Sequence, residues 1–131
     1  MAKRQIPFAL RWLPALIMMV AIFFFSSLPA STLPYFGLWD VLVKKGGHMT
    51  GYAMLGLAYY FALPVSLKRS YRWMLALLMA LLFSLSDEFH QSFVQGRTSS
   101  LVDVGIDMAG TIIALAISAR YSSNSRSNSP D

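Results

Sequence analysis

Four carboxylates and a histidine stand near the ends of apolar stretches in this 131-residue chain, where ionisable side chains are costly to bury. Asp87 and Glu88 lie near the end of one apolar stretch, and Asp103 and Asp107 near the start of the next. His48 begins an earlier stretch. Carboxylates and imidazoles transfer protons in enzymes, so Glu88, Asp103 and His48 are the candidate catalytic residues.

Cations accompany these acids. Arg97 lies between the two stretches, and Lys44 and Lys45 precede the histidine. A guanidinium group binds phosphate or carboxylate through paired hydrogen bonds, so these cations predict an anionic ligand. The predicted substrate-binding residues are Arg97, Lys45, Gln91, Tyr52, Asp87, Asp107 and Ser100. The chain has no cysteine and no standard metal-ligand spacing, and we predict neither a metal nor another cofactor.

Four apolar stretches must position these residues. They run from about 8 to 28, 48 to 67, 72 to 93 and 101 to 120. A helix needs about 20 mostly apolar residues to cross a bilayer. The composition agrees, because 56% of the residues are hydrophobic and only 13% are charged. We therefore predict an all-α membrane protein, an antiparallel bundle of four transmembrane helices, rather than a soluble enzyme domain or a nucleic-acid-binding protein.

The polar residues are expected to share one layer of this bundle. With a helical rise of about 1.5 Å per residue, Asp87 lies about 22 Å from Arg72, and Asp107 lies about 20 Å from Arg120. In a hydrocarbon core of about 30 Å, both carboxylates fall in the half of the bilayer opposite those arginines. The sequence thus predicts one polar site at the outer leaflet.

The distribution of lysine and arginine predicts the orientation. With both termini inside, eight of these residues lie on the cytoplasmic side and three on the other, so we predict an N-in, C-in topology. A cleaved signal peptide is the alternative for the first stretch, but that stretch exceeds the usual apolar core of about 7–15 residues. Residues 1–121 are predicted to form one domain, and residues 122–131 a disordered polar tail.

Two motifs in this chain resemble those of the VanZ-like family of small membrane proteins. The first is Lys45-x-x-His48-x-x-x-Tyr52. The second begins with residues 87–94 (DEFHQSFV) and continues as Gly96-Arg97-x-x-Ser100-x-x-Asp103-x-x-x-Asp107. The resemblance covers residues 39–114. It implies a multi-pass protein of the bacterial inner membrane with a role in low-level teicoplanin tolerance, and it names no reaction.

Three functions are consistent with these features. The first is a cell-envelope protein that binds or processes an anionic, lipid-linked or wall-associated molecule at the outer leaflet. The second is a small proton-coupled transporter or channel subunit, since carboxylates and histidines carry protons through membranes. The third is a non-catalytic scaffold whose buried charges only hold the helices together.

Overall fold

The computed structural model describes residues 5–127, with side chains described up to Asn124. Most of the described residues are helical and none of them lies in a strand, which confirms the all-α prediction. The elements are α1 (Phe8–Arg11), α2 (Leu13–Ser27), η1 (Ala30–Thr32), η2 (Gly37–Trp39), α3 (Asp40–Ala62), α4 (Arg69–Gln91) and α5 (Leu101–Ser127).

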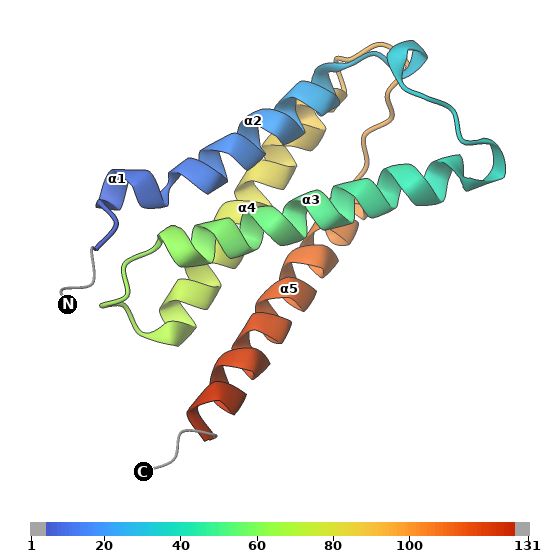
Figure 1. Ribbon diagram of the computed structural model, residues 1–131. Coiled ribbons are helices and arrows are strands. Elements are labelled where there is room, and N and C mark those ends of the chain that lie inside the picture. Colours follow the sequence, from blue (N-terminus) through green and yellow to red (C-terminus); the bar gives the residue numbers. More distant parts are fainter. Residues whose placement is uncertain (1–4, 128–131) are drawn as a thin grey trace.

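The four long helices alternate in direction along the chain (Figure 1). Both ends of the chain and the connection between α3 and α4 lie at one end of the molecule, here called the terminal end. The connections from α2 to α3 and from α4 to α5 lie at the other, here called the polar end. Helix α3 packs against α2, α4 and α5.

The first apolar stretch is one nearly continuous helix with a break at Trp12. The backbone of Trp12 remains in the right-handed helical region, and Pro14 follows in the first turn of α2. Proline has no N–H to donate and its ring crowds the preceding turn, so a helix normally starts or bends there. The break therefore coincides with the one proline that this stretch contains between residues 8 and 27.

Helix α3 differs from the predicted second stretch at both ends. It ends at Ala62, because Pro64 favours an extended backbone at Leu63, whose ψ is 146°. It begins at Asp40, whose carboxylate accepts a hydrogen bond of 3.2 Å from the backbone N–H of Phe36. The expected span of about 48–67 is thus corrected to a helix over residues 40–62, and Lys45 lies inside the helix rather than before it.

Helices α4 and α5 follow the other two predicted stretches closely. α5, however, continues to Ser127, beyond the expected domain boundary at residue 121. Extending an existing helix adds one hydrogen bond for each residue fixed, which is far easier than starting a new helix. Residues 122–127 are therefore helical, and the remainder of the predicted disordered tail, residues 128–131, lies outside the described residues.

Within the described part of the chain, three helical segments, not the four predicted, are long and apolar enough to cross a membrane: Phe8–Ser27, Arg69–Gln91 and Leu101–Asn124. Helix α3 does not meet this criterion, because charged and polar residues occupy much of its first nine positions. Those residues include Asp40, Lys44, Lys45 and His48. Most large apolar side chains on the described helices, such as Val20 and Phe24, are exposed, as expected for a surface that faces lipid.

The interior is small and depends on a close approach of α3 and α5. Tyr52, Leu55 and Leu115 are buried between the helices. A Cβ atom at Gly110 would lie 2.3 Å from the backbone carbonyl oxygen of Met49, so only glycine allows these two backbones to approach so closely. This contact holds the residues of α3 and α5 at the polar end near one another.

At the terminal end, two arginines hydrogen-bond to carbonyl oxygens at the end of α3. The guanidinium group of Arg11 donates hydrogen bonds to the carbonyl oxygens of Phe61 and Leu63, at 3.0 and 2.8 Å. Arg72 donates one of 2.8 Å to the carbonyl oxygen of Tyr60. These carbonyls belong to the end of α3, where no further helical N–H can reach them, and positive charge at a helix C-terminus is favourable.

Candidate functional site

A cavity of about 260 Å³ opens at the polar end, between the first turns of α3, the end of α4 and the start of α5. Charged and polar side chains form much of its wall. They are Asp40, Lys44, Lys45, His48, Glu88, Gln91, Arg97, Thr98 and Asp103. A site predicted from three separate stretches of sequence is thus built around one shared space.

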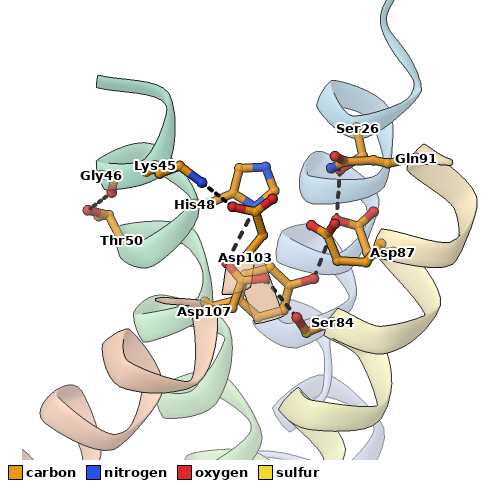
Figure 2. A network of polar contacts seen from close by, with 12 residues as sticks. Ser26, Lys45, Gly46, His48, Thr50, Ser84, Asp87, Gln91, Asp103 and Asp107 are labelled. Carbon is orange, nitrogen blue, oxygen red and sulfur yellow. Dashed lines mark hydrogen bonds and ion pairs between the residues drawn. The ribbon is translucent and has the colours of Figure 1, made fainter. Parts of the chain in front are cut away.

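Lys45 and Asp103 form an ion pair across this cavity. The Lys45 ammonium on α3 donates a hydrogen bond to the Asp103 carboxylate on α5 (Figure 2). The second oxygen of that carboxylate accepts a hydrogen bond of 3.1 Å from the Ser100 hydroxyl, and Ser100 immediately precedes α5. Asp103 is therefore held by both neighbours and keeps the lysine directed across the cavity mouth.

Glu88 is almost completely buried, with 6% of its surface exposed. Its carboxylate accepts a hydrogen bond of 3.1 Å from the backbone N–H of Ser100, one of the free N–H groups at the start of α5. The positive end of the helix dipole also favours a negative charge there. No Lys or Arg among the described residues forms an ion pair with this carboxylate.

His48 and Asp107 face one another below the ion pair. The imidazole Nδ1 of His48 lies 3.4 Å from one carboxylate oxygen of Asp107, and the aspartate is fully buried. The other carboxylate oxygen accepts a hydrogen bond of 2.7 Å from the Ser84 hydroxyl. One residue from each of α3, α4 and α5 therefore meets at this point.

A second buried group joins α2 to α4. Ser26 donates a hydrogen bond of 2.8 Å to the Asp87 carboxylate and accepts one of 2.9 Å from the Gln91 amide. The Tyr52 hydroxyl approaches the same carboxylate oxygen at 3.5 Å. Figure 2 shows Ser26, Asp87 and Gln91 together on one side of the view, and Lys45, His48 and Asp103 on the other.

Arg97 reaches the cavity from the loop that connects α4 to α5. Gly96, directly before it, has a φ of 73°, a conformation that glycine adopts without strain. A Cβ there would also lie 3.0 Å from the Cβ of Ala30 in the α2–α3 connection. The turn thus joins the two loops of the polar end, and Arg97 forms no ion pair with any described residue.

Lys44, the remaining cation of the cavity wall, is paired within its own helix. Its ammonium lies 2.8 Å from the Asp40 carboxylate, one helical turn earlier. The hydrogen bond from Lys44 holds the pKa of the Asp40 carboxyl below its ordinary value. Two of the three cations in the wall are therefore matched with a carboxylate.

The structure brings most of the predicted site residues to the cavity. Those that line it are Lys45, His48, Glu88, Gln91, Arg97 and Asp103. Asp87 and Asp107 are buried behind this wall, and Tyr52 borders a neighbouring apolar groove instead. Ser100 lies outside the wall and hydrogen-bonds to two of its carboxylates.

Several hydrogen-bonding residues of the site were not among the predicted site residues. Ser26 and Ser84 each donate to a buried aspartate, and Thr111 donates to the carbonyl oxygen of Tyr52 at 3.0 Å. The ring of His90 stacks on Phe23, with 4.4 Å between the centroids. Serine and threonine occur throughout membrane helices. Only their spacing of three or four residues from a buried acid marks them in the sequence, as for Ser84 before Asp87 and Thr111 after Asp107.

The arrangement has two chemical capacities. A guanidinium without a carboxylate partner beside a polar cavity can bind an anion, and carboxylates beside an imidazole can transfer protons. Three side chains, His48, Glu88 and Asp107, also have ligand atoms within 4.8 Å of one another, as the ligands of a metal ion would.

The comparison with known families agrees with the resemblance of the two motifs. The family model described as VanZ/LLP1 matches residues 11–121, most of the chain and more than the region that carries the motifs. No curated protein and no solved structure matches the chain.

Proposed function

The chain belongs to the VanZ/LLP1 family, and on this premise we propose that it is a multi-pass protein of the bacterial inner membrane that binds an anionic, lipid-linked molecule of the cell envelope. The ligand's charged headgroup would occupy the cavity at the polar end, on the outer side of the membrane. The family and three long apolar helices support the membrane setting. The headgroup, the topology and the role in teicoplanin tolerance are the parts that we propose.

The positions of the charged residues along the helices support four membrane crossings, with α3 as one of them. The charged residues of α3 are confined to its start, and the stretch from Met49 to Ala62 carries none. α3 runs beside α5 and packs against it, so it can span the same part of the bilayer as α5. Most of the Lys and Arg residues lie at the terminal end, which favours that end as the cytoplasmic one.

The proposal of an anionic ligand depends on one observation, the position of Arg97. Its guanidinium borders the cavity without a carboxylate partner among the described residues, whereas Lys44 and Lys45 are each paired with an aspartate. Guanidinium groups bind phosphate in a planar, two-pronged geometry that lysine does not offer. A phosphate-bearing headgroup therefore fits the one free cation of the described cavity wall.

A neighbouring groove supports a lipid-linked ligand rather than a free anion. This groove, of about 390 Å³, lies between α2 and α3 and is lined mostly by apolar side chains such as Met18, Ile22 and Phe25. It shares Leu33, Lys44, His48 and Arg97 with the polar cavity, so the two spaces adjoin. A molecule with an anionic head and a hydrocarbon chain would fill both.

Glu88 and His48 are the residues that we propose for proton transfer if the ligand is processed as well as bound. Both line the cavity, so a headgroup there would meet their side chains directly. Asp103, the third catalytic candidate, is paired with Lys45 and is better placed to hold that lysine than to accept a proton.

A proton-coupled transporter is less well supported. A conducting path needs polar groups through the whole bilayer, and the described polar network ends at Thr111. Nearer the terminal end, the buried side chains are Leu55, Tyr59, Ala76 and Leu115. A scaffold without a ligand would explain the buried ion pairs, and it differs from our proposal in leaving Arg97 without a function.

Binding to protein in lipid nanodiscs tests the proposal. The probes are a polyprenyl phosphate, the same polyprenol without phosphate, and inorganic phosphate. We expect the polyprenyl phosphate to bind most tightly and Arg97→Ala to weaken it by about tenfold to a hundredfold, since hydrogen bonds to charged groups contribute about 1.5–3 kcal/mol. Lys68→Ala, a cation removed at the terminal end, is the matched control. Equal binding by Arg97→Ala and wild type would contradict the proposal.

The role in cells is tested with the same variants. We expect Arg97→Ala and Glu88→Gln to lose teicoplanin tolerance while their membrane levels stay normal. Loss of the protein from the membrane would instead support the scaffold. Turnover of the bound probe that Glu88→Gln abolishes, with its affinity unchanged, would show processing in addition to binding.

A further inference from the structure

Three side chains that commonly bind metal ions converge at the base of the cavity. His48 comes from α3, Glu88 from α4 and Asp107 from α5, and one ligand atom of each lies within 4.8 Å of the other two. The two carboxylates are buried, while the imidazole is half-buried and borders the cavity. A small ion could therefore reach this point through the cavity and would be enclosed by three helices.

Two side-chain atoms of these residues lack a hydrogen-bond partner among the described residues. They are Nδ1 of His48 and Oδ1 of Asp107, both buried and 3.4 Å apart. A buried carboxylate oxygen without a hydrogen-bond partner is unfavourable, because it has lost the water that it would bind in solution. An ion that binds two ligands at about 2.1 Å in a tetrahedral arrangement holds them about 3.4 Å apart, so the separation suits a shared cation.

The local charge points the same way. Asp87, Glu88 and Asp107 are buried carboxylates, and none of them forms an ion pair with a described Lys or Arg. Hydroxyl groups and one backbone N–H are their described hydrogen-bond donors. Several buried carboxylates around one imidazole leave an excess of negative charge, which a divalent cation would offset.

We propose that His48, Glu88 and Asp107 bind a divalent transition-metal cation of the Zn²⁺ or Mn²⁺ type. An imidazole among carboxylates favours such ions over Mg²⁺ and Ca²⁺, which prefer oxygen ligands throughout. His48 and Glu88 line the cavity, so an ion held by these residues would be reached from it. Ser84 supports the site from behind, since its hydroxyl holds the second oxygen of Asp107. This inference goes beyond the proposed function, and metal binding does not depend on the lipid-linked ligand. With a metal bound, His48 and Glu88 would act as its ligands in place of the proton transfer proposed for them.

Metal titration of the full-length protein in detergent tests the inference without any lipid ligand. After treatment with a chelator, the protein is titrated with ZnCl₂, MnCl₂ or MgCl₂ by calorimetry, and with CoCl₂ by absorption. We expect one Zn²⁺ or Mn²⁺ per chain, weaker Mg²⁺, and visible Co²⁺ bands of a low-coordinate site. Asp107→Asn, Glu88→Gln and His48→Ala should each weaken Zn²⁺ or Mn²⁺ binding by at least about a hundredfold.

Asp40→Asn is the matched control, because it removes a nearby carboxylate of the cavity wall outside the three ligands and outside the predicted site residues. It should keep wild-type affinity within a few-fold. If Asp107→Asn does not fold, Ser84→Ala replaces it and should weaken binding about tenfold to a hundredfold, as expected for a residue that orients a ligand. Wild-type protein that binds no metal, or binding that the ligand variants and Ser84→Ala leave unchanged, would overturn the inference and leave His48 and Asp107 as an ion pair.

Discussion

Ser26 on α2 donates a hydrogen bond of 2.8 Å to Asp87 on α4, and both side chains are almost fully buried. The same hydroxyl accepts a hydrogen bond from Gln91. One serine therefore hydrogen-bonds to a buried carboxylate and a buried amide at once, and it connects the first apolar helix to the rest of the polar end.

Ser26→Ala should consequently destabilise the fold by about 1–3 kcal/mol, because it leaves buried polar groups of Asp87 and Gln91 without this partner. The change is measured as the shift of the unfolding curve in SDS or of the thermal transition in detergent. Ser92→Ala is the control, since the described hydrogen bond of the exposed Ser92 hydroxyl goes to the carbonyl oxygen of Phe89 in the preceding turn. Equal stabilities of the two variants would show that the Ser26 contact is not formed.

The hydrogen-bond partner of Ser26 illustrates what the sequence predicts and what it leaves open. Apolar runs and the i,i+4 spacing of acids predict the helices and the polar layer, because both follow from helix geometry and the cost of burying charge in lipid. Which side chain of one helix meets which side chain of another depends on the rotation and depth of each helix. Neither of these is written in a single stretch of sequence.

The sequence also does not predict which cation pairs with which carboxylate. The sequence places Lys44, Lys45 and Arg97 near the same acids, and any of them could pair with Asp103 by charge alone. The structure pairs Lys45 with Asp103 because helix α3 starts at Asp40, earlier than the apolar run predicts, so this lysine faces α5. The start of α3 could not be predicted from hydropathy, because its first turns are charged and hydropathy detects only apolar segments.

Gly110 offers a second test of the packing. A Cβ at this position would lie 2.3 Å from the Met49 carbonyl oxygen, so Gly110→Ala must push α3 and α5 apart. Overpacking of this kind typically destabilises by about 1–3 kcal/mol. Gly105→Ala, on the same helix, meets no atom within 4 Å and should be neutral or stabilise by up to about 1 kcal/mol, since alanine favours helix.

Unfolding in SDS compares these two glycine variants directly. A loss of stability for Gly110→Ala alone supports the close approach of α3 and α5. Similar stabilities for both variants would mean that the two backbones are farther apart than the structure has them.

Asp40 predicts a local pH dependence at the start of α3. The hydrogen bond from Lys44 holds the pKa of this carboxyl below its ordinary value of 3.8. The folded state therefore favours the ionised form, so the contribution is complete above the ordinary pKa and disappears as the pH falls through the lower, folded-state pKa. The Phe36 amide, which donates to the carboxylate, should change its NMR shift in that window below 3.8.

Asp40→Asn is the control for this titration, because its amide does not ionise. The Phe36 amide of that variant should show no transition in the same pH range. A wild-type transition at or above the ordinary pKa would contradict the pairing of Asp40 with Lys44.

Single cysteines test the proposed topology, because the chain has no cysteine of its own. With four crossings and both termini inside, Thr98→Cys should react with an impermeant maleimide on intact cells and Ser70→Cys should not. If α3 does not cross, both results are reversed, since α4 then begins outside and ends inside. Ser31→Cys, in the connection between α2 and α3, should react in either case and controls for access.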